Sequence, residues 1–254
     1  MRWIQRLALV VGPQSIHAEL LKYDEWLAEA KSFEPELRTL RQSLHEIPEV
    51  GYEEFETSKF IQRRLKNIGV DFTSGWAKNT RLDRFPGAGG TGIVATIGSG
   101  KPIVMLRADF DALPISEENE ELSFKSKTAG KMHACGHDAH TSMLIGAARL
   151  LKEKEKAGKL PKGTIRLVWQ PAEEGGAGAK RMVEEGVLDG VSRVFGFHVS
   201  PFEPFGVVGS GPGFHMAAGE SFEFYVEGSG GHAAAPHKVK DPVVAAAGVI
   251  TALQ

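Results

Sequence analysis

The sequence predicts an α/β fold. Three apolar segments with strand composition, Ile103 to Leu106, Thr164 to Gln170 and Val191 to Phe197, are separated by segments with helical spacing. Polar or charged residues follow each apolar segment, and open α/β sheets place their sites just beyond the carboxyl ends of their strands. These observations predict a functional site at one edge of the sheet.

The composition fits one large or two modest globular domains and excludes several function classes. Of the 254 residues, 42% are apolar and 24% are charged, as in ordinary globular proteins. The net charge of -2 offers no basic surface for nucleic acid. No apolar run reaches the length of a membrane span, and the run from Leu7 to Val11 is shorter than a signal-peptide core. We therefore expect a cytoplasmic protein without nucleic-acid or membrane partners.

Two helices and a first strand are predicted before the strand at Ile103. The first helix begins near Phe33, has leucines on one face and ends before Pro48. The second runs from about Glu53 to Asn67. Residues 73–91 are interpreted as an irregular surface loop, and a strand is predicted from Gly92 to Ile97.

The strand from Ile103 to Leu106 has the continuous apolar composition of a covered central strand and leads into a polar segment. Asp109, at its end, could accept the free ring N–H of a metal-binding histidine and fix the tautomer of that ring. The alternative is a solvated acidic turn, or an ion pair of Asp109 with Arg107. Taken alone, these residues favour that alternative.

Residues 132–140, Met-His-Ala-Cys-Gly-His-Asp-Ala-His, hold the only cysteine and three of the nine histidines. Thiolate and imidazole are ligands that borderline-soft divalent metals prefer. Cys135 and His137 can point at one ion from a loop or strand end, although not from one helix face. A helix is predicted from Asp138 as N-cap, and a thiol just before a helix has its ionised form favoured. The alternative is a buried free cysteine beside surface histidines, because Cys-x-His alone is a weak pattern.

Two later strand ends supply further candidate ligands. The strand that ends at Gln170 is followed by Glu173 and Glu174, adjacent carboxylates of which one could bind a metal while the other faces a water molecule. The alternative is a surface acidic pair in the first turn of a helix. The strand from Val191 ends at His198, where a lone histidine is more often structural. The set that predicts a metal site is therefore Cys135, His137, Glu174 and His198.

The C-terminal part predicts the beginning of a second domain. Residues 199–219 are rich in Gly and Pro, as in a linker. The segment Ser221 to Glu227 alternates aromatic and polar residues and is predicted to be a strand of a sheet with one open face. A glycine-rich loop with His232 and His237 follows, and an apolar helix is predicted over Val243 to Leu253.

Five segments resemble, in the same order, the dinuclear-metal amidohydrolases of the aminoacylase/carboxypeptidase group. They are RADFDALP (107–114), HACGHD (133–138), QPAEEGGAGA (170–179), GFHVSP (196–201) and GSGGHAAAPH (228–237). The resemblance is nearest to the subfamily of hippurate hydrolases and plant hydrolases of indole-acetyl amino acid conjugates. LHEIPEVGYEEFETSKFI (44–61) also resembles that subfamily. The resemblance covers roughly residues 34 to 254.

The resemblance implies a role for each candidate residue. The metal ligands would be Cys135, His137, Glu174 and His198, the general base Glu173, and His232 a lid residue that polarises the substrate carbonyl. It implies a metallopeptidase-like α/β catalytic domain over residues 34–215, in which a mixed sheet is flanked by helices. It also implies the start of a small α+β lid or dimerisation domain over 217–254. It also implies one or two zinc or manganese ions and a homodimer through the lid.

The implied reaction is metal-assisted hydrolysis of the amide bond of an N-acyl amino acid, with Glu173 as proton carrier and His232 stabilising the oxyanion. A true peptidase fits the same motifs. Members of the family continue beyond the end of this sequence and supply one further metal-binding histidine. The alternative function is therefore a truncated, catalytically impaired form that keeps a partial metal site and a dimerisation surface.

Overall fold

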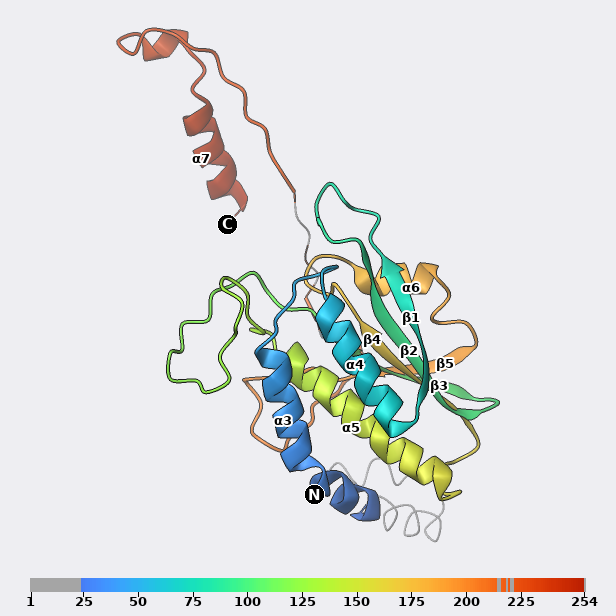
Figure 1. Ribbon diagram of the computed structural model, residues 1–254. Coiled ribbons are helices and arrows are strands. Elements are labelled where there is room, and N and C mark those ends of the chain that lie inside the picture. The colour runs from blue at the N-terminus through green and yellow to red at the C-terminus, as the bar shows by residue number, and fades with distance from the viewer. Residues whose placement is uncertain (1–23, 214–215, 218, 220–221, 254) are drawn as a thin grey trace. The chain divides into compact units, whose positions relative to one another are not determined.

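The computed structural model describes residues 24–213, 216–217, 219 and 222–253 (Figure 1). The chain divides into two compact units between Gly209 and Ser210. The apolar run from Leu7 to Val11, interpreted above as too short for a signal peptide, lies outside the described residues. None of the helices in the described ranges is long and apolar enough to cross a membrane.

A five-stranded sheet forms the centre of the first unit. Its strands are β1 (Asp71–Lys78), β2 (Gly89–Ser99), β3 (Ile103–Asp109), β4 (Gly163–Gln170) and β5 (Val191–Gly196), and their order is β1-β2-β4-β3-β5. Strand β2 pairs antiparallel with β1 and β4, whereas β3 pairs parallel with β4 and β5. The predicted α/β fold with a mixed sheet is confirmed, and the carboxyl ends of β3, β4 and β5 meet at one edge.

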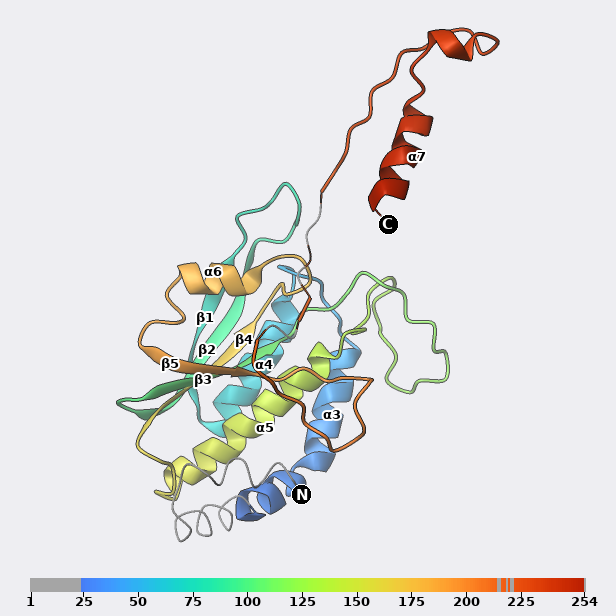
Figure 2. The ribbon, with the colours of Figure 1, turned by 180° about the vertical axis from the view of Figure 1, so that it is seen from behind.

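Helices cover both faces of this sheet. Helices α3 (Glu34–His45), α4 (Phe55–Ile68) and α5 (His137–Lys156) lie on one face, and α6 (Gly178–Glu184) lies on the other (Figures 1 and 2). A further helix over residues 24–32 precedes α3. The helices predicted near Phe33 and Glu53 are thus confirmed, and Gly69 ends α4 in the left-handed region, with a φ of 79°.

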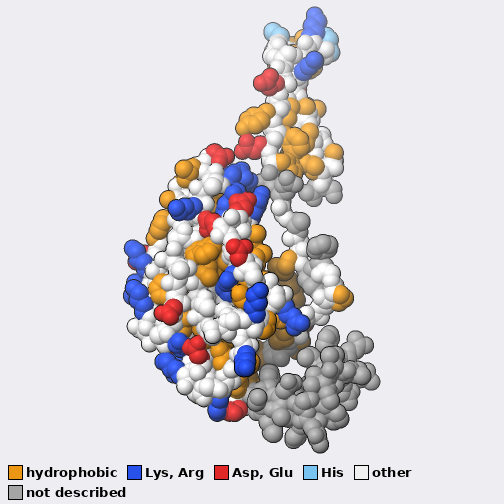
Figure 3. All heavy atoms as spheres, turned by 90° about the vertical axis from the view of Figure 1, so that its right-hand side faces the viewer, with side chains coloured by type: hydrophobic (Ala, Val, Ile, Leu, Met, Phe, Trp, Pro, Cys, Tyr) orange, Lys and Arg blue, Asp and Glu red, His pale blue; other side chains and the backbone are white. Residues whose placement is uncertain are grey.

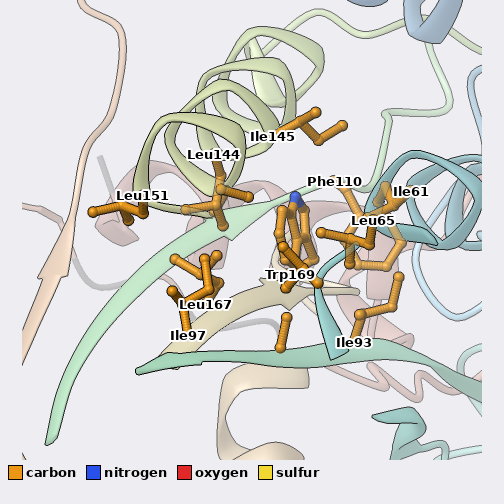
Figure 4. Packing of buried hydrophobic residues seen from close by; sticks show 14 of the residues in the cluster. Ile61, Leu65, Ile93, Ile97, Phe110, Leu144, Ile145, Leu151, Leu167 and Trp169 are labelled. Atoms are coloured by element: carbon orange, nitrogen blue, oxygen red, sulfur yellow. The ribbon is translucent and has the colours of Figure 1, made fainter. Parts of the chain in front are cut away.

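The two faces of the sheet bury different sets of side chains. On the face of α3 to α5, Trp169 of β4 packs with Leu144 and Leu151 of α5 (Figure 4). The neighbouring residue of β4, Val168, points to the opposite face and packs with Met182 of α6. Successive residues of β4 point alternately into these two cores. A shift of β4 by one residue would turn each of its side chains toward the wrong core, so the register of β4 is fixed.

The loop prediction over residues 73–91 was wrong in its first part, because residues Asp71–Lys78 form the edge strand β1. Most side chains of β1 are exposed, and the register with β2 shifts on both sides of Trp76. Such a strand has no continuous apolar alternation for sequence analysis to detect. The irregular segment is restricted to residues 79–88 between β1 and β2.

The second unit contains the helix α7 (Pro242–Leu253), as predicted, and a 3-10 turn (Pro236–Lys238). Asp241 caps α7 by accepting the backbone N–H of Val243 at 2.8 Å. Of the predicted strand from Ser221 to Glu227, the described residues 222–227 form no strand and have no strand partner within the described ranges. A strand requires a neighbouring backbone for its hydrogen bonds, whatever its side-chain alternation.

Candidate metal centre

The predicted ligands gather where β3, β4 and β5 end and α5 begins. Cys135, His137 and His198 each offer a ligand atom within 4.8 Å of the other two. His137 also forms such a group with Glu173 and Glu174. The structure thus brings five of the predicted site residues together, with His137 shared by both groups.

The start of α5 differs from the prediction that Asp138 caps it. The helix begins at His137, and Gly136 is the N-cap, with a φ of 90°. A Cβ atom at Gly136 would lie 2.5 Å from Cγ2 of Val199, so glycine is needed both for its conformation and for space. The carboxylate of Asp138 is turned toward His45 instead, with Oδ2 2.8 Å from Nδ1 of that ring.

Hydrogen bonds define which ring nitrogen each histidine offers to the site. Nδ1 of His137 lies 2.9 Å from the carbonyl oxygen of Asp111, and Nδ1 of His198 lies 2.7 Å from that of Val199. A carbonyl oxygen only accepts, so each Nδ1 carries a hydrogen and each Nε2 is the nitrogen available to a cation. Nε2 of His198 lies 3.4 Å from Sγ of Cys135.

The two carboxylates approach the same atom of His137. Oε2 of Glu173 lies 3.9 Å from Nε2 of His137, and Oε1 of Glu174 lies 4.0 Å from it. These distances do not separate a ligand from a base. The side chain of Glu173 is more exposed, at 40% against 26% for Glu174, and therefore more accessible to water.

Two acidic residues to which sequence analysis gave no role hold the segment of Glu173 and Glu174 in place. Ala172, which adopts a left-handed φ of 51°, donates its N–H to Oε1 of the buried Glu54 at 2.8 Å. Glu174 donates its N–H to Oδ2 of Asp111 at 2.9 Å. Asp111 lies two residues beyond Asp109, where an extended chain points the same way, and this spacing could have indicated it. No local pattern indicated Glu54.

Asp109 pairs with Arg107, as the alternative from the sequence has it, and also accepts a hydrogen bond from a histidine that is not a predicted ligand. Its Oδ2 lies 2.6 Å from Nη1 of Arg107 and 3.6 Å from Nε2 of His137, while Oδ1 lies 2.6 Å from Nδ1 of His140. Burial opposes ionisation of Asp109, but the hydrogen bond from His140 and the charge of Arg107 prevail and lower its pKa. Asp109 is therefore a buried anion that contacts a histidine outside the predicted ligand set.

The surroundings of two candidate ligands, Cys135 and His137, favour their protonated forms. Burial, with the charge of Glu174, raises the pKa of the Cys135 thiol to about 12. Burial and the acidic neighbours thus act against the thiolate form, which the helix start was expected to favour. For His137, burial acts against the charged form, but the hydrogen bond to Asp111 and the charge of Asp109 raise the pKa to about 9.

A divalent cation fits this arrangement. Nε2 of His137 and Oε1 of Glu174 are buried and have no hydrogen-bond partner within the described ranges. Buried polar atoms without partners are rare and costly in native proteins. A thiol sulfur, two imidazole nitrogens and carboxylates form a donor set suited to Zn²⁺, and the nitrogen and oxygen donors also suit Mn²⁺.

His232 is not part of this group in the first unit. It lies in the second unit, is exposed, and accepts the N–H of Ala234 on Nδ1 at 3.1 Å. Its role in polarising a substrate carbonyl therefore stays a prediction.

Residues 105–253 match the sequence model of "Peptidase family M20/M25/M40". The chain belongs to this family. The recognition made from the five motifs is thereby confirmed, and the M20 fold agrees with the observed mixed sheet and helices.

Relatives of this M20 chain with assigned names include hydrolases of amino acid conjugates. It is 48% identical over 229 residues to IAA-amino acid hydrolase ILR1-like 5 of Arabidopsis thaliana, covering 90% of this chain and 49% of that protein. It is 44% identical over 225 residues to N-acetyl-L-cysteine deacetylase of Bacillus subtilis, covering 88% of this chain and 50% of that protein. The chain thus spans about half the length of these relatives.

Solved M20 structures show the same fold. A putative aminohydrolase from methicillin-resistant Staphylococcus aureus superposes with a TM-score of 0.69 at 39% identity, over 91% of this chain and 58% of that one. A dinuclear metal binding peptidase of Bacillus subtilis superposes with a TM-score of 0.59 at 43% identity, over 68% of this chain and 45% of that one. A divalent-metal site at the sheet edge agrees with these similarities.

Proposed function

We propose that this chain is the metal-binding part of an amidohydrolase that cleaves N-acyl amino acids into a carboxylate and a free amino acid. The observation that carries the proposal is the convergence of Cys135, His137, Glu173, Glu174 and His198 at one sheet edge. Two of their buried polar atoms have no hydrogen-bond partner in the part of the chain that the structure describes. The names of the plant and bacterial relatives support conjugates of this chemical class as substrates.

In this proposal Cys135, His137, Glu174 and His198 hold one or two zinc or manganese ions. When bound, such an ion supplies positive charge that lowers the pKa of water and polarises a carbonyl group. The sulfur donor of Cys135 favours zinc over manganese. A thiol ligand also has to stay reduced, which supports the cytoplasmic location expected from the sequence.

Glu173 is proposed as the general base. It takes a proton from the water molecule whose oxygen attacks the amide carbon, and it returns that proton to the leaving nitrogen when the C–N bond breaks. Burial, with the charge of Glu174, raises the pKa of Glu173 and brings it closer to neutral pH, as a proton carrier requires. His232 is proposed to donate a hydrogen bond to the oxyanion.

Residues 217–254 of the second unit are proposed to begin the lid or dimerisation domain, and residues 34–215 are proposed to belong to the catalytic domain. Hydrophobic side chains are exposed on this unit (Figure 3), and Val243, Val244 and Ile250 of α7 are 74%, 68% and 65% accessible. A second copy of the chain would cover such side chains. Analytical ultracentrifugation of the chain, with and without Val244→Glu, measures whether it dimerises.

The proposed activity is tested by loading the chain with Zn²⁺ or Mn²⁺ and measuring the amino acid released from a panel of N-acetyl and N-indoleacetyl amino acids. Because the relatives are about twice as long, a fusion to the second half of the Bacillus subtilis deacetylase is assayed beside it. Release that depends on added metal and is lost in Glu173→Gln supports the proposal. A fusion that is folded, binds metal and releases no amino acid contradicts it.

A further inference from the structure

His140 lies beside the proposed ligands, is 2% exposed, and has both ring nitrogens engaged. Nδ1 lies 2.6 Å from Oδ1 of Asp109, and Nε2 accepts the backbone N–H of Val199 at 3.0 Å. A backbone N–H can only donate, so Nε2 must carry the lone pair and Nδ1 the hydrogen. The two contacts therefore select one neutral tautomer of His140.

A direct role of His140 as a metal ligand is the obvious alternative. Its ring offers a donor atom within 4.8 Å of donors from Asp109 and His137. The lone pair on Nε2, however, is already used by Val199, and Nδ1 carries the hydrogen donated to Asp109. Nε2 of His137, by contrast, is buried and unpartnered among the described residues. The geometry distinguishes a histidine that can bind a cation from one that cannot.

Val199 connects His140 to a proposed ligand. Its N–H is bound by His140, and its carbonyl oxygen accepts the Nδ1 hydrogen of His198 at 2.7 Å. Its side chain packs over Gly136, where a Cβ atom would lie 2.5 Å from Cγ2. The same residue thus touches the segment between Cys135 and His137 and orients the ring of His198.

The sheet itself does not hold this segment. The last residue of β5 paired with β3 is Gly196, opposite Arg107, and His198 lies beyond it. The rings of His140 and His198 stand edge to face with their centroids 4.5 Å apart. The position of His198 therefore depends on contacts with α5, of which the bond from Val199 to His140 is the directional one.

We propose that His140 is a positioning residue, which holds the main chain at Val199 so that Nε2 of His198 meets Cys135 and His137. Asp109 takes part by accepting the Nδ1 hydrogen, which leaves Nε2 as the acceptor. The inference rests on the proposed function insofar as these three residues form a cation site. In this proposal Asp109 orients the ring of His140 and not the ring of a proposed metal ligand.

A pair of substitutions separates the two ring nitrogens. The side-chain oxygen of His140→Gln reaches the place of Nε2 and can accept the N–H of Val199, whereas that of His140→Asn reaches only the place of Nδ1. Zinc affinity is measured by competition with a chromophoric chelator, and ligation by Cys135 by the thiolate-to-metal absorption of the cobalt-loaded chain. We expect His140→Asn to lose about 10- to 100-fold in zinc affinity, as removal of a ligand's support does elsewhere, and His140→Gln to keep most of it.

Equal zinc affinity in the chain and both variants would overturn the positioning role. An equal loss in both variants, with fewer zinc ions bound per chain, would make His140 a ligand and overturn it as well. If both variants fail to fold, judged by circular dichroism, the unsubstituted chain still decides the question through ¹⁵N NMR of its histidine rings. The expected result is an unprotonated Nε2 of His140 that shifts little when zinc binds, while Nε2 of His198 shifts strongly.

A protonated Nε2 of His140, or a zinc-induced shift like that of His198, contradicts the proposal. Hydrolysis of N-acyl amino acids is measured on the same preparations and answers a different question. A chain that shows the expected order of zinc affinities but, fused as above, hydrolyses none of these substrates supports the positioning role and refutes the proposed function.

Discussion

Nδ1 of His45 lies 2.8 Å from Oδ2 of Asp138, although the two residues are 93 positions apart in the chain. Nε2 of the same ring lies 3.1 Å from Oε1 of Glu117. His45 and Asp138 are both buried, at 5% and 3% exposure. The ring of His45 therefore joins the end of α3 to the first turn of α5 and to the loop that precedes residues 132–140.

The charge of His45 should make stability depend on pH. The hydrogen bond to Asp138 outweighs burial and raises the pKa of His45 above its ordinary value of 6.5. The stabilisation by the charged ring is thus fully present below pH 6.5 and is lost as the pH rises through the folded-state pKa. We expect His45→Gln to lower the free energy of unfolding by about 3 kcal/mol at pH 6 and by less at pH 9. Urea unfolding at both values measures this, and an equal loss at both would contradict it.

Glu54 should also make stability fall as the pH rises, but its neutral substitution should stabilise the fold at high pH. Burial, with the charge of Asp111, raises the pKa of Glu54 to about 8, from an ordinary value of 4.5. Between these two values the folded chain keeps a proton that the unfolded chain has lost, so stability falls as the pH rises. Glu54→Gln is neutral and keeps an acceptor for the N–H of Ala172. We expect it to be more stable than the original chain at pH 8.5 and little different at pH 5 in urea unfolding with a chelator present. Parallel stability curves would show that Glu54 is not protonated in the fold.

Metal uptake should release protons. The raised pKa values of Cys135, about 12, and His137, about 9, mean that both ligands hold a proton at pH 7.5 that a cation must replace. Calorimetry of zinc binding in buffers with different ionisation enthalpies should detect about two protons released per ion, and affinity should increase from pH 6 to pH 9. Cys135→Ser should lower the release by about one. Binding without proton release would exclude both residues as ligands.

Substitutions of the adjacent residues Glu173 and Glu174 should separate a loss of catalysis from a loss of metal binding. Glu173→Gln should lower kcat by about 10²- to 10⁴-fold in the active fusion, as loss of a general base does, while metal content stays unchanged. Glu174→Gln should weaken metal binding first, so that part of its activity returns at high metal concentration. Elemental analysis and kinetics on the same samples decide between them. Hydrolysis by Glu173→Gln close to that of the unsubstituted enzyme would remove Glu173 as the base.

Local patterns were sufficient for much of this fold. The buried strands β3 and β4 and the helices α4 and α5 were predictable because each carries its own apolar periodicity over consecutive residues. Strand β1 was not, because an exposed, irregular edge strand takes its structure from its neighbour β2. The segment at residues 222–227 shows the converse, since its alternation favours a strand but no partner is present among the described residues.

The ligand candidates were also predictable, because residue type and position after a strand carry chemical information. The residues that hold these candidates in place were not predictable. Glu54 acts on Ala172 from 118 positions away, and Asp109 meets His140 across 31 positions. A buried acid or histidine looks the same in sequence whether it binds a cation or holds a backbone N–H. Only the tertiary structure distinguishes the two.

The strand order has a consequence for how the protein is made. Because β4 lies between β2 and β3, it has to pair with segments that precede it by many residues, as Trp169 does with Ile93. Pairing over such separations is slow, and the last of the site's strands, β5, follows β4 in the chain. In a chain leaving the ribosome, the proposed ligands of this sequence therefore cannot come together until residue 198 has emerged and the parallel strands have assembled. A cation that binds only the assembled sheet stabilises the folded state by mass action. A shortage of metal should therefore shorten the lifetime of the folded protein and leave its rate of folding unchanged.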